Sequence, residues 1–129
     1  WGLDVYSDVY GNVFGKNGID TYVSAAPINQ FVLGKTLLGL QDTIGNVAEW
    51  CFDTYAKYDS IEKTDPYGPD TVGDKVYRGG SWAEPASQIS VSNRSGLSPT
   101  STSATIGFRI VRFANGTDPL HIHESVSPQ

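Results

Sequence analysis

Two glycine-containing, strand-like runs constrain the fold of this chain more than any other feature. The first is residues 75–82 (KVYRGGSW) and the second is residues 106–112 (IGFRIVR). β-branched and aromatic residues favour strands, and glycines let a second backbone approach closely. The sequence therefore predicts two strands that hold the intervening residues in a rigid frame.

The segment between these runs, residues 83–105, has a different character. It is rich in Ser, Thr, Ala, Pro and Gly, has no aromatic residue, and carries only two formal charges, Glu84 and Arg94. Small interchangeable residues on a fixed scaffold are typical of a binding surface whose contacts are free to differ.

Composition limits the classes of protein that this chain can belong to. With 129 residues and a net charge of −5, it fits one domain and has no basic stripe, which argues against nucleic acid as a partner. No apolar run approaches the roughly 20 residues that a transmembrane helix needs. The single cysteine, Cys51, cannot form an internal disulfide.

The organisation along the chain is rich in loops. The 14 glycines and 7 prolines leave no long helical period, and only residues 37–58 could hold a short helix, which Gly39 and Gly45 disfavour. We expect an α+β domain, mostly β and loop, over residues 1–113. Residues 114–129 are expected to form a C-terminal tail.

A long motif resembles a known family. Residues 38–50 (LGLQDTIGNVAEW), with Asp53 and Tyr55, resemble the signature of the formylglycine-generating (sulfatase-modifying factor) family. Further family motifs follow in the same order, namely Asp65-Pro66, Gly68-Pro69, Arg78-Gly79-Gly80-Ser81-Trp82, Arg94 and Gly107-Phe108-Arg109. Trp1-Gly2 resembles the opening of the second half of the family's domain. The resemblance implies a C-type-lectin-like fold whose front half is absent from this chain, and that half is a candidate partner.

The resemblance also bears on catalysis. The family's oxidases use two cysteines that bind copper and the substrate cysteine, and these positions map onto Glu84 and Ile89, the second in a less certain register. No cysteine follows Cys51, and neither Ser nor Glu can replace a thiolate ligand. We therefore expect no catalytic residue, no copper and no oxidase activity. Cys51 itself is interpreted as a small buried hydrophobe.

Two calcium sites are implied by the same resemblance. The first comprises the side chains of Asp42 and Glu49 with the carbonyls of Gly45 and Val47, an oxygen-only set of the kind that calcium prefers. The second comprises the side chains of Asn12 and Asp20 with the carbonyls of Val13 and Tyr22. Alternatively, the Asp and Asn side chains cap turns, and Glu49 faces solvent or pairs with an arginine.

The chain most resembles the variable proteins of diversity-generating retroelements. In these, a stretch between such strands is diversified by adenine-directed mutation, largely at Asn codons. Most small residues of 83–105 are reachable from an Asn codon, whereas Glu84 and Gln88 are not. The resemblance implies a protein or surface ligand, and a location outside the cell or displayed on its surface.

The candidate binding residues follow from this interpretation. With Tyr77 and Trp82 as an aromatic floor, they are Ala83, Glu84, Pro85, Ser87, Gln88, Ser95, Gly96, Leu97, Ser98, Thr100, Ser101, Ser103, Ala104 and Thr105. Two alternatives remain open. The segment could be a solvated Ser/Thr linker of a degenerate family member, or the chain could belong to an enzyme whose catalytic groups lie outside it.

The interpretation also predicts burial. Trp82 and Phe108 should be largely buried in the frame, and Gly79 and Gly80 should adopt unusual φ angles or sit where a side chain is excluded. The polar residues of 83–105 should instead be exposed on one face: Glu84, Ser87, Gln88, Ser95, Leu97, Ser98, Thr100 and Ser103.

Overall fold

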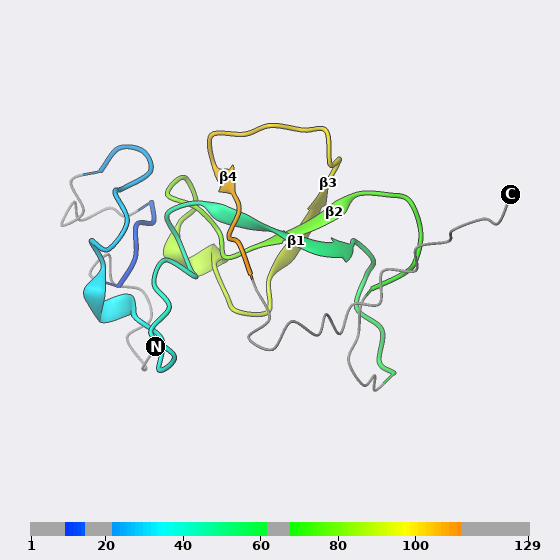
Figure 1. Cartoon of the computed structure of the whole chain (residues 1–129), viewed down its shortest axis with the longest axis horizontal. Coiled ribbons are helices and arrows are strands. Elements are labelled where there is room, and N and C mark those ends of the chain that lie inside the picture. The colour runs from blue at the N-terminus through cyan, green and yellow to red at the C-terminus, as the bar shows by residue number, and fades with distance from the viewer. Residues whose placement is uncertain (1–9, 15–21, 62–67, 112–129) are drawn as a thin grey trace, which may run out of the picture.

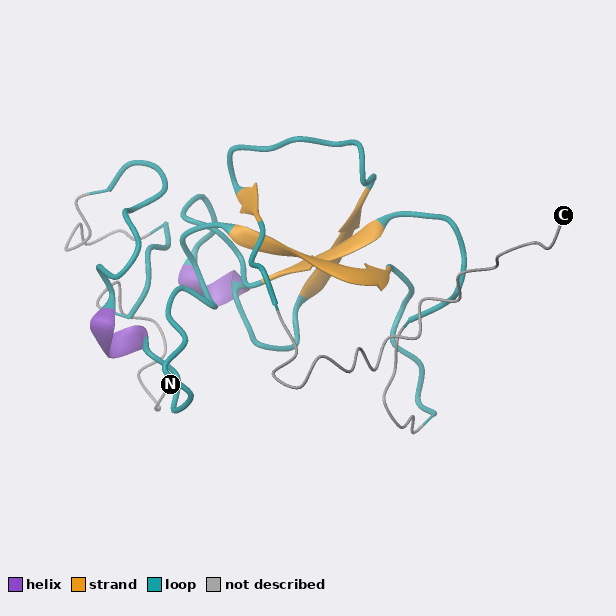
Figure 2. Ribbon diagram, viewed as in Figure 1, coloured by secondary structure: helices purple, strands orange, loops and turns teal. Residues whose placement is uncertain are grey.

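A four-stranded sheet forms the centre of the molecule, and loops account for most of the remaining chain (Figures 1 and 2). The computed structural model describes residues 10–14, 22–61 and 68–111. The strands are β1 (Ala48–Thr54), β2 (Lys75–Arg78), β3 (Arg94–Leu97) and β4 (Ile106–Gly107), and they lie in the order β3-β2-β1-β4. The mostly β, loop-rich architecture that the sequence predicts is therefore confirmed.

The central strands β1 and β2 pair in antiparallel fashion. Trp50 lies opposite Tyr77, and their rings meet edge to face with centroids 6.0 Å apart. Val76, the residue before Tyr77 in β2, is fully buried, as a β-branched residue at the centre of a sheet is expected to be. These two strands form the rigid part of the frame.

The edge strands are joined by a connection that crosses from one side of the sheet to the other. β3 pairs with β2 in antiparallel fashion, whereas β4 runs parallel to β1. Because β3 and β4 are opposite edges, residues 98–105 must span the width of the sheet, and Figure 1 shows them as an arch that stands off it. We call residues 98–105 the arch.

Asn46 ties the N-terminal loops to the sheet. Its buried side chain accepts a hydrogen bond from the backbone N–H of Ala26 (2.8 Å) and donates to the Ala26 carbonyl (3.2 Å). Its own N–H donates to the Asn12 carbonyl, and its carbonyl accepts from the N–H of Trp82. One residue thus satisfies the backbone polar groups of three segments, which would be costly to bury unpaired.

Glycines allow these segments to approach closely. A Cβ on Gly45 would lie 2.6 Å from the Asn12 carbonyl oxygen, and one on Gly79 would lie 2.9 Å from that of Thr43. Gly79 and Gly80 have φ angles of 93° and 68°, a region that favours glycine. The prediction of unusual φ angles at Gly79 and Gly80 is confirmed.

Residues 37–58 contain no helix, in agreement with the presence of Gly39 and Gly45, and they provide β1. Three other expectations need correction. Of the described residues 106–111, only Ile106 and Gly107 pair in the sheet, and Arg112 lies outside the described residues. Phe108 is 75 % exposed, so the prediction that it is buried is wrong, and Trp82 is half-buried rather than fully buried.

The helices within the described residues are single short 3₁₀ turns, η1 (Val32–Gly34) and η2 (Ala86–Gln88). Among the described residues, none belongs to a helix that is long and apolar enough to cross a membrane.

Candidate functional site

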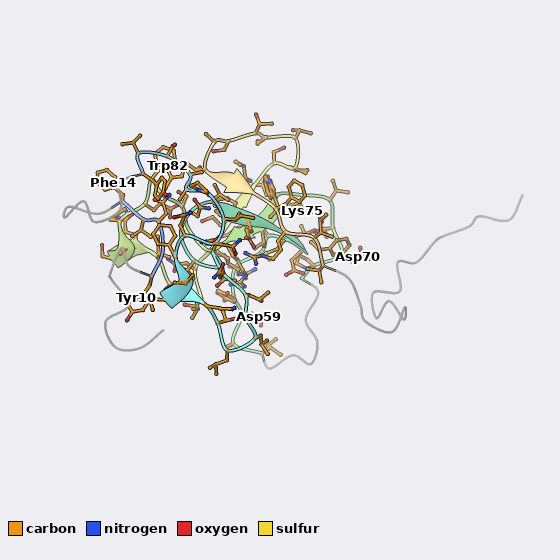
Figure 3. All side chains as sticks on the ribbon, turned by 60° about the vertical axis from the view of Figure 1, so that its left-hand side comes forward. Tyr10, Phe14, Asp59, Asp70, Lys75 and Trp82 are labelled. Atoms are coloured by element: carbon orange, nitrogen blue, oxygen red, sulfur yellow. The ribbon has the colours of Figure 1, made fainter. Side chains whose placement is uncertain are left out.

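The segment after β2 turns sharply and fixes Glu84. The buried hydroxyl of Ser81 donates to the Glu84 carboxylate (3.2 Å) and accepts from the N–H of Ala83 (3.3 Å). The Glu84 carbonyl accepts a hydrogen bond from Phe14 (2.9 Å). Trp82 and Phe14 consequently lie at the same end of the molecule, away from Lys75 (Figure 3). Both the carboxylate and the backbone carbonyl of Glu84 are therefore held by hydrogen bonds.

A cavity of about 260 Å³ opens beside this segment. It is bounded by the end of β2, the connection that contains η2, and the start of β3. The lining residues are Tyr77, Arg78, Gly79, Gly80, Glu84, Gln88, Ile89, Ser90, Asn93, Arg94 and Ser95. Tyr77, Glu84, Gln88 and Ser95, four of the predicted binding residues, are thus brought to one place.

The arch is a second, separate group of predicted residues. Its hydroxyls pair locally, Ser98 with Thr100 at 3.0 Å and Ser103 with Thr105 at 2.8 Å. The Trp82 indole N–H donates to the carbonyl of Ala104 (3.5 Å) and so connects the arch to the segment after β2. Polar atoms that satisfy one another locally leave the arch free of long-range constraints on its side chains.

The predicted surface residues differ in exposure. The exposed members are Ala83, Ser87, Gln88, Ser95, Thr100, Ser103 and Ala104, and the half-buried members are Glu84, Pro85, Gly96, Leu97, Ser98, Ser101 and Thr105. Gly96 faces away from solvent, because a Cβ there would lie 2.5 Å from the ring of Tyr55. The predicted residues therefore do not form one exposed face: four line the cavity, six lie in the arch, and Trp82, Ala83, Pro85, Ser87, Gly96 and Leu97 belong to neither group.

The two arginines of the cavity lining, Arg78 and Arg94, were not predicted as binding residues. Arg94 interrupts a long stretch of Ser and Thr as its only cation, and that isolation is a signal that could have identified it. Arg78 pairs directly opposite Arg94 across the β2–β3 ladder. Only the register of the sheet reveals that the two residues are neighbours.

The loop that precedes β1 carries the first predicted calcium set. Asp42 and Gly45 have positive φ angles (55° and 77°), and one carboxylate oxygen of Asp42, Oδ1, is buried without a hydrogen-bond partner. Glu49 pairs with Arg109, with Oε1 2.6 Å from Nη2 and Oε2 2.9 Å from Nε. This hydrogen bond raises the pKa of the Arg109 guanidinium.

The fit of a cation to this loop depends on backbone oxygens. No group of three or more His, Cys, Asp and Glu side chains with metal-binding spacing occurs in residues 10–14, 22–61 and 68–111. A cation would therefore need the carbonyls of Gly45 and Val47 as well as the orphan Asp42 oxygen. The carboxylate of Glu49 retains further lone pairs beside its pairing with Arg109, so the donor set is compatible with calcium.

The second predicted calcium set is only partly described. The Asn12 side chain is 1 % exposed, and its amide nitrogen donates to the carbonyl of Ser24 and to Oδ1 of Asn46. Val13 is buried and the ring of Tyr22 meets that of Phe31 edge to face. Asp20 lies outside the described residues, as do the tail at 114–129, Trp1-Gly2 and Asp65-Pro66.

Cys51 does not have the environment of a reactive thiol. Burial raises the pKa of its thiol, and the nearby Arg78 only partly offsets this. A higher pKa leaves less of the nucleophilic thiolate at neutral pH.

Known proteins resemble this chain in sequence. Residues 3–114 match the sulfatase-modifying factor enzyme 1-like domain. The formylglycine-generating enzyme of Streptomyces coelicolor is 35 % identical over 122 residues, which are 91 % of this chain and 38 % of that protein. The mouse formylglycine-generating enzyme is 31 % identical over 110 residues, or 81 % of this chain and 29 % of that protein. The chain thus spans only 29–38 % of the length of these relatives.

Similarity extends to a mouse relative described as inactive and to a solved structure. The inactive C-alpha-formylglycine-generating enzyme 2 of mouse is 33 % identical over 100 residues, covering 74 % of this chain and 28 % of that protein. Treponema denticola variable protein 1 superposes with a TM-score of 0.63 and 29 % identity, over 78 % of this chain and 35 % of that one.

These matches confirm both resemblances drawn from the motifs, to the formylglycine-generating family and to a variable protein. They also agree with the C-type-lectin-like fold that the motifs imply. The chain belongs to the sulfatase-modifying factor enzyme 1-like domain family.

Proposed function

We propose that this chain is a non-catalytic ligand-binding domain that presents residues 83–105 as a diversified surface on a fixed scaffold. The observation that carries the proposal is the division between frame and arch. The frame is held by buried backbone hydrogen bonds around Asn46, whereas the arch hydroxyls bond mainly to one another. The exposed side chains of the arch bond mainly within the arch, so they can change without loss of the fold.

Two further observations support a binding role rather than catalysis. The positions of the family's oxidase cysteines hold Glu84 and Ile89, and the chain has no cysteine after Cys51. The Treponema denticola protein whose structure it resembles is described as a variable protein. A location outside the cell, or on its surface, and a protein or surface ligand are parts of this proposal.

The adjoining DNA tests the retroelement class directly. A near-identical template repeat of the codons for residues 83–105, beside a reverse transcriptase gene, is expected. A locus with neither feature would contradict diversification. It would favour the alternative in which residues 83–105 are a solvated Ser/Thr linker of a degenerate family member.

A binding experiment tests the surface itself. One library randomises Ser87, Gln88, Ser95, Ser98, Thr100 and Ser103, and each variant is displayed and selected against hen lysozyme as a probe protein. A matched control library randomises an equal number of exposed positions in the loop around Lys35, Leu37 and Leu38. Folded binders from the first library, at a clearly higher frequency than from the control, are expected; equal frequencies would contradict the proposal.

The rest of the family domain is proposed as a second partner. Many apolar side chains are exposed, among them Phe108 (75 %) and Ile110 (85 %) beyond β4 and Leu38 (88 %) in the loop before β1. The relatives are about three times as long as the region matched here. Further domain residues packing on this apolar surface would shield it from water.

The alternative is an enzyme whose catalytic groups lie in such further residues. If the alternative holds, adding the further domain residues to this chain produces oxidase activity on a cysteine peptide. The binding proposal predicts instead that adding them raises the free energy of unfolding without producing activity. Calcium is proposed as a structural ion at Asp42, Gly45, Val47 and Glu49, where it would hold the loop that leads into β1.

A further inference from the structure

Two like charges face each other across the β2–β3 ladder. Arg78 and Arg94 are directly opposite partners, a placement that destabilises a sheet when both side chains are charged. In residues 10–14, 22–61 and 68–111, neither guanidinium has a carboxylate within ion-pairing distance. The chain as a whole carries net charge −5, so acidic residues are not scarce; they are simply not placed here.

One tyrosine holds both guanidinium groups in position. The Arg78 Nη2 donates to the Tyr58 hydroxyl (3.1 Å), and the Arg94 Cζ lies 3.9 Å from the centroid of the Tyr58 ring. Tyr58 in turn donates to the Ser92 carbonyl (3.0 Å), which fixes the ring. The two cations are therefore preorganised side by side, and little entropy is lost when they bind a third group.

Arg94 has unused donors. Its Nε is buried without a hydrogen-bond partner, and within the described part of the chain its guanidinium makes only ring contacts, with Tyr58 and with Tyr55 at 5.6 Å. A buried charged donor without a partner is costly. The planar fork of a guanidinium matches a carboxylate or a phosphate, which would accept hydrogen bonds from the Nη groups of Arg94.

The acidic side chains near the pair do not cancel its charge. Glu49, which lies opposite Arg78 on β1, is already paired with Arg109. Glu84 lines the same cavity, where it accepts a hydrogen bond from Ser81. Two arginines against one carboxylate leave the roughly 260 Å³ cavity with an excess of positive charge.

We propose that Arg78 and Arg94 form a binding site for an oxyanion, a carboxylate or a phosphate, at the side of the surface formed by residues 83–105. The inference rests on the proposed function in one respect: the rest of the same ligand would contact the surface formed by residues 83–105. A ligand of this domain then carries an acidic group. Arg94 belongs to residues 83–105 but would stay constant, as Arg78 does, and the two arginines supply an anchor that the small variable residues around them lack.

The test follows the arginine Nε–Hε signals in ¹H–¹⁵N spectra during titration with inorganic phosphate and, in a second arm, with succinate. Sodium chloride keeps the ionic strength constant, because exposed charges are screened by salt. Saturable shifts of the Arg78 and Arg94 signals are expected, while the Arg109 signal, already bonded to Glu49, should stay in place. The probe that binds more tightly, phosphate or succinate, shows whether the site prefers a phosphate or a carboxylate group.

Variants separate a built site from general attraction. Arg78→Gln and Arg94→Gln should each weaken binding at least about tenfold, the usual effect of removing a charged hydrogen bond. Lys35→Gln removes one positive charge from another exposed loop and should leave the affinity unchanged. If Arg94→Gln does not fold, Tyr58→Phe removes only the hydroxyl that holds Arg78 and should weaken binding severalfold.

Linear shifts in both arms, or equal weakening by Lys35→Gln and Arg78→Gln, would overturn the oxyanion site. Saturable anion binding combined with failure of the library selection would instead overturn the proposed function alone. The two ideas are thus tested by different measurements.

Discussion

The carboxylate of Glu49 accepts three hydrogen bonds from the guanidinium of Arg109, two from Nε and one from Nη2, 60 residues further along the chain. Arg109 also donates to the Gln41 carbonyl (3.0 Å). Because Glu49 lies in β1 and Arg109 follows β4, the pair closes the edge of the sheet where only Ile106 and Gly107 make strand hydrogen bonds. The ion pair therefore reinforces the short strand pairing at the sheet edge next to the arch.

We expect removal of this pair to destabilise the fold. Both side chains are about a quarter to a third exposed, so solvent screening reduces the effect, and Arg109→Ala should lower the free energy of unfolding by about 1–2 kcal/mol. Urea unfolding of Arg109→Ala, Glu49→Gln and the double variant measures the coupling between them. Strictly additive losses would contradict a direct interaction.

Much of the frame could be predicted from residue types. The run at 75–78 becomes β2, and Gly79 and Gly80 take the positive φ angles that only glycine tolerates well. These features follow from local stereochemistry, which a sequence encodes directly. The hydrogen bonds of Asn46 are different, because they reach Ala26, 20 residues away in the chain, and residue types alone do not predict them.

The remaining features depend on contacts between distant segments. Phe108 looks like a core residue by type, yet it is 75 % exposed, because no described segment packs over the residues after β4. The division of residues 83–105 into cavity lining and arch arises from strand order, which residue types do not specify. The stacking of Arg94 on Tyr58 likewise depends on how two distant segments are arranged in space.

A glycine pair tests the close approach at the centre of the frame. Gly45 and Gly39 both have positive φ, so an alanine is strained at either position. A Cβ on Gly45 would also lie 2.6 Å from a backbone oxygen of Asn12, whereas the nearest atom to a Cβ on Gly39 is the mobile end of Lys35. Gly45→Ala should therefore cost at least about 2 kcal/mol more than Gly39→Ala, as measured by thermal unfolding. Equal costs would argue against this packing.

Oxidase activity should be absent. The chain has no thiolate to hold copper or the substrate cysteine after Trp82, and Cys51 has a raised pKa. Incubation with copper, oxygen and a sulfatase-type cysteine peptide should leave the peptide mass unchanged, while the Streptomyces coelicolor relative serves as a positive control. Formylglycine formed at a catalytic rate would contradict the non-catalytic proposal.

Calcium should raise stability if it binds the loop before β1. An ion that binds only the folded state stabilises it by mass action, so the melting temperature should be higher with calcium than with a chelator. Asp42→Asn keeps the shape of the side chain but removes the charge of the carboxylate whose Oδ1 is buried without a hydrogen-bond partner. This variant should therefore show a smaller difference in melting temperature between calcium and chelator. A matched control, Asp74→Asn in the turn before β2, should preserve the full difference. Identical melting curves in calcium and chelator would exclude the site.

Substitutions should divide the chain into frame and arch. Thr100 and Ser103 are exposed and bond mainly to neighbouring hydroxyls, so replacing either should change the free energy of unfolding by no more than about 0.5 kcal/mol. Trp82 is half-buried, and its indole donates to Ala104, so Trp82→Ala should cost roughly 2 kcal/mol, about half the value for a buried aromatic residue.

Phe108 provides the matched comparison for Trp82. Because 75 % of its surface is exposed in the described chain, Phe108→Ala should cost less than about 1 kcal/mol here. In a protein that also contains the further domain residues proposed above, the same substitution should cost roughly 3–5 kcal/mol, the value for a buried phenylalanine. Chemical unfolding of both forms measures the two costs. A small cost in both would mean that nothing packs on the surface beyond β4.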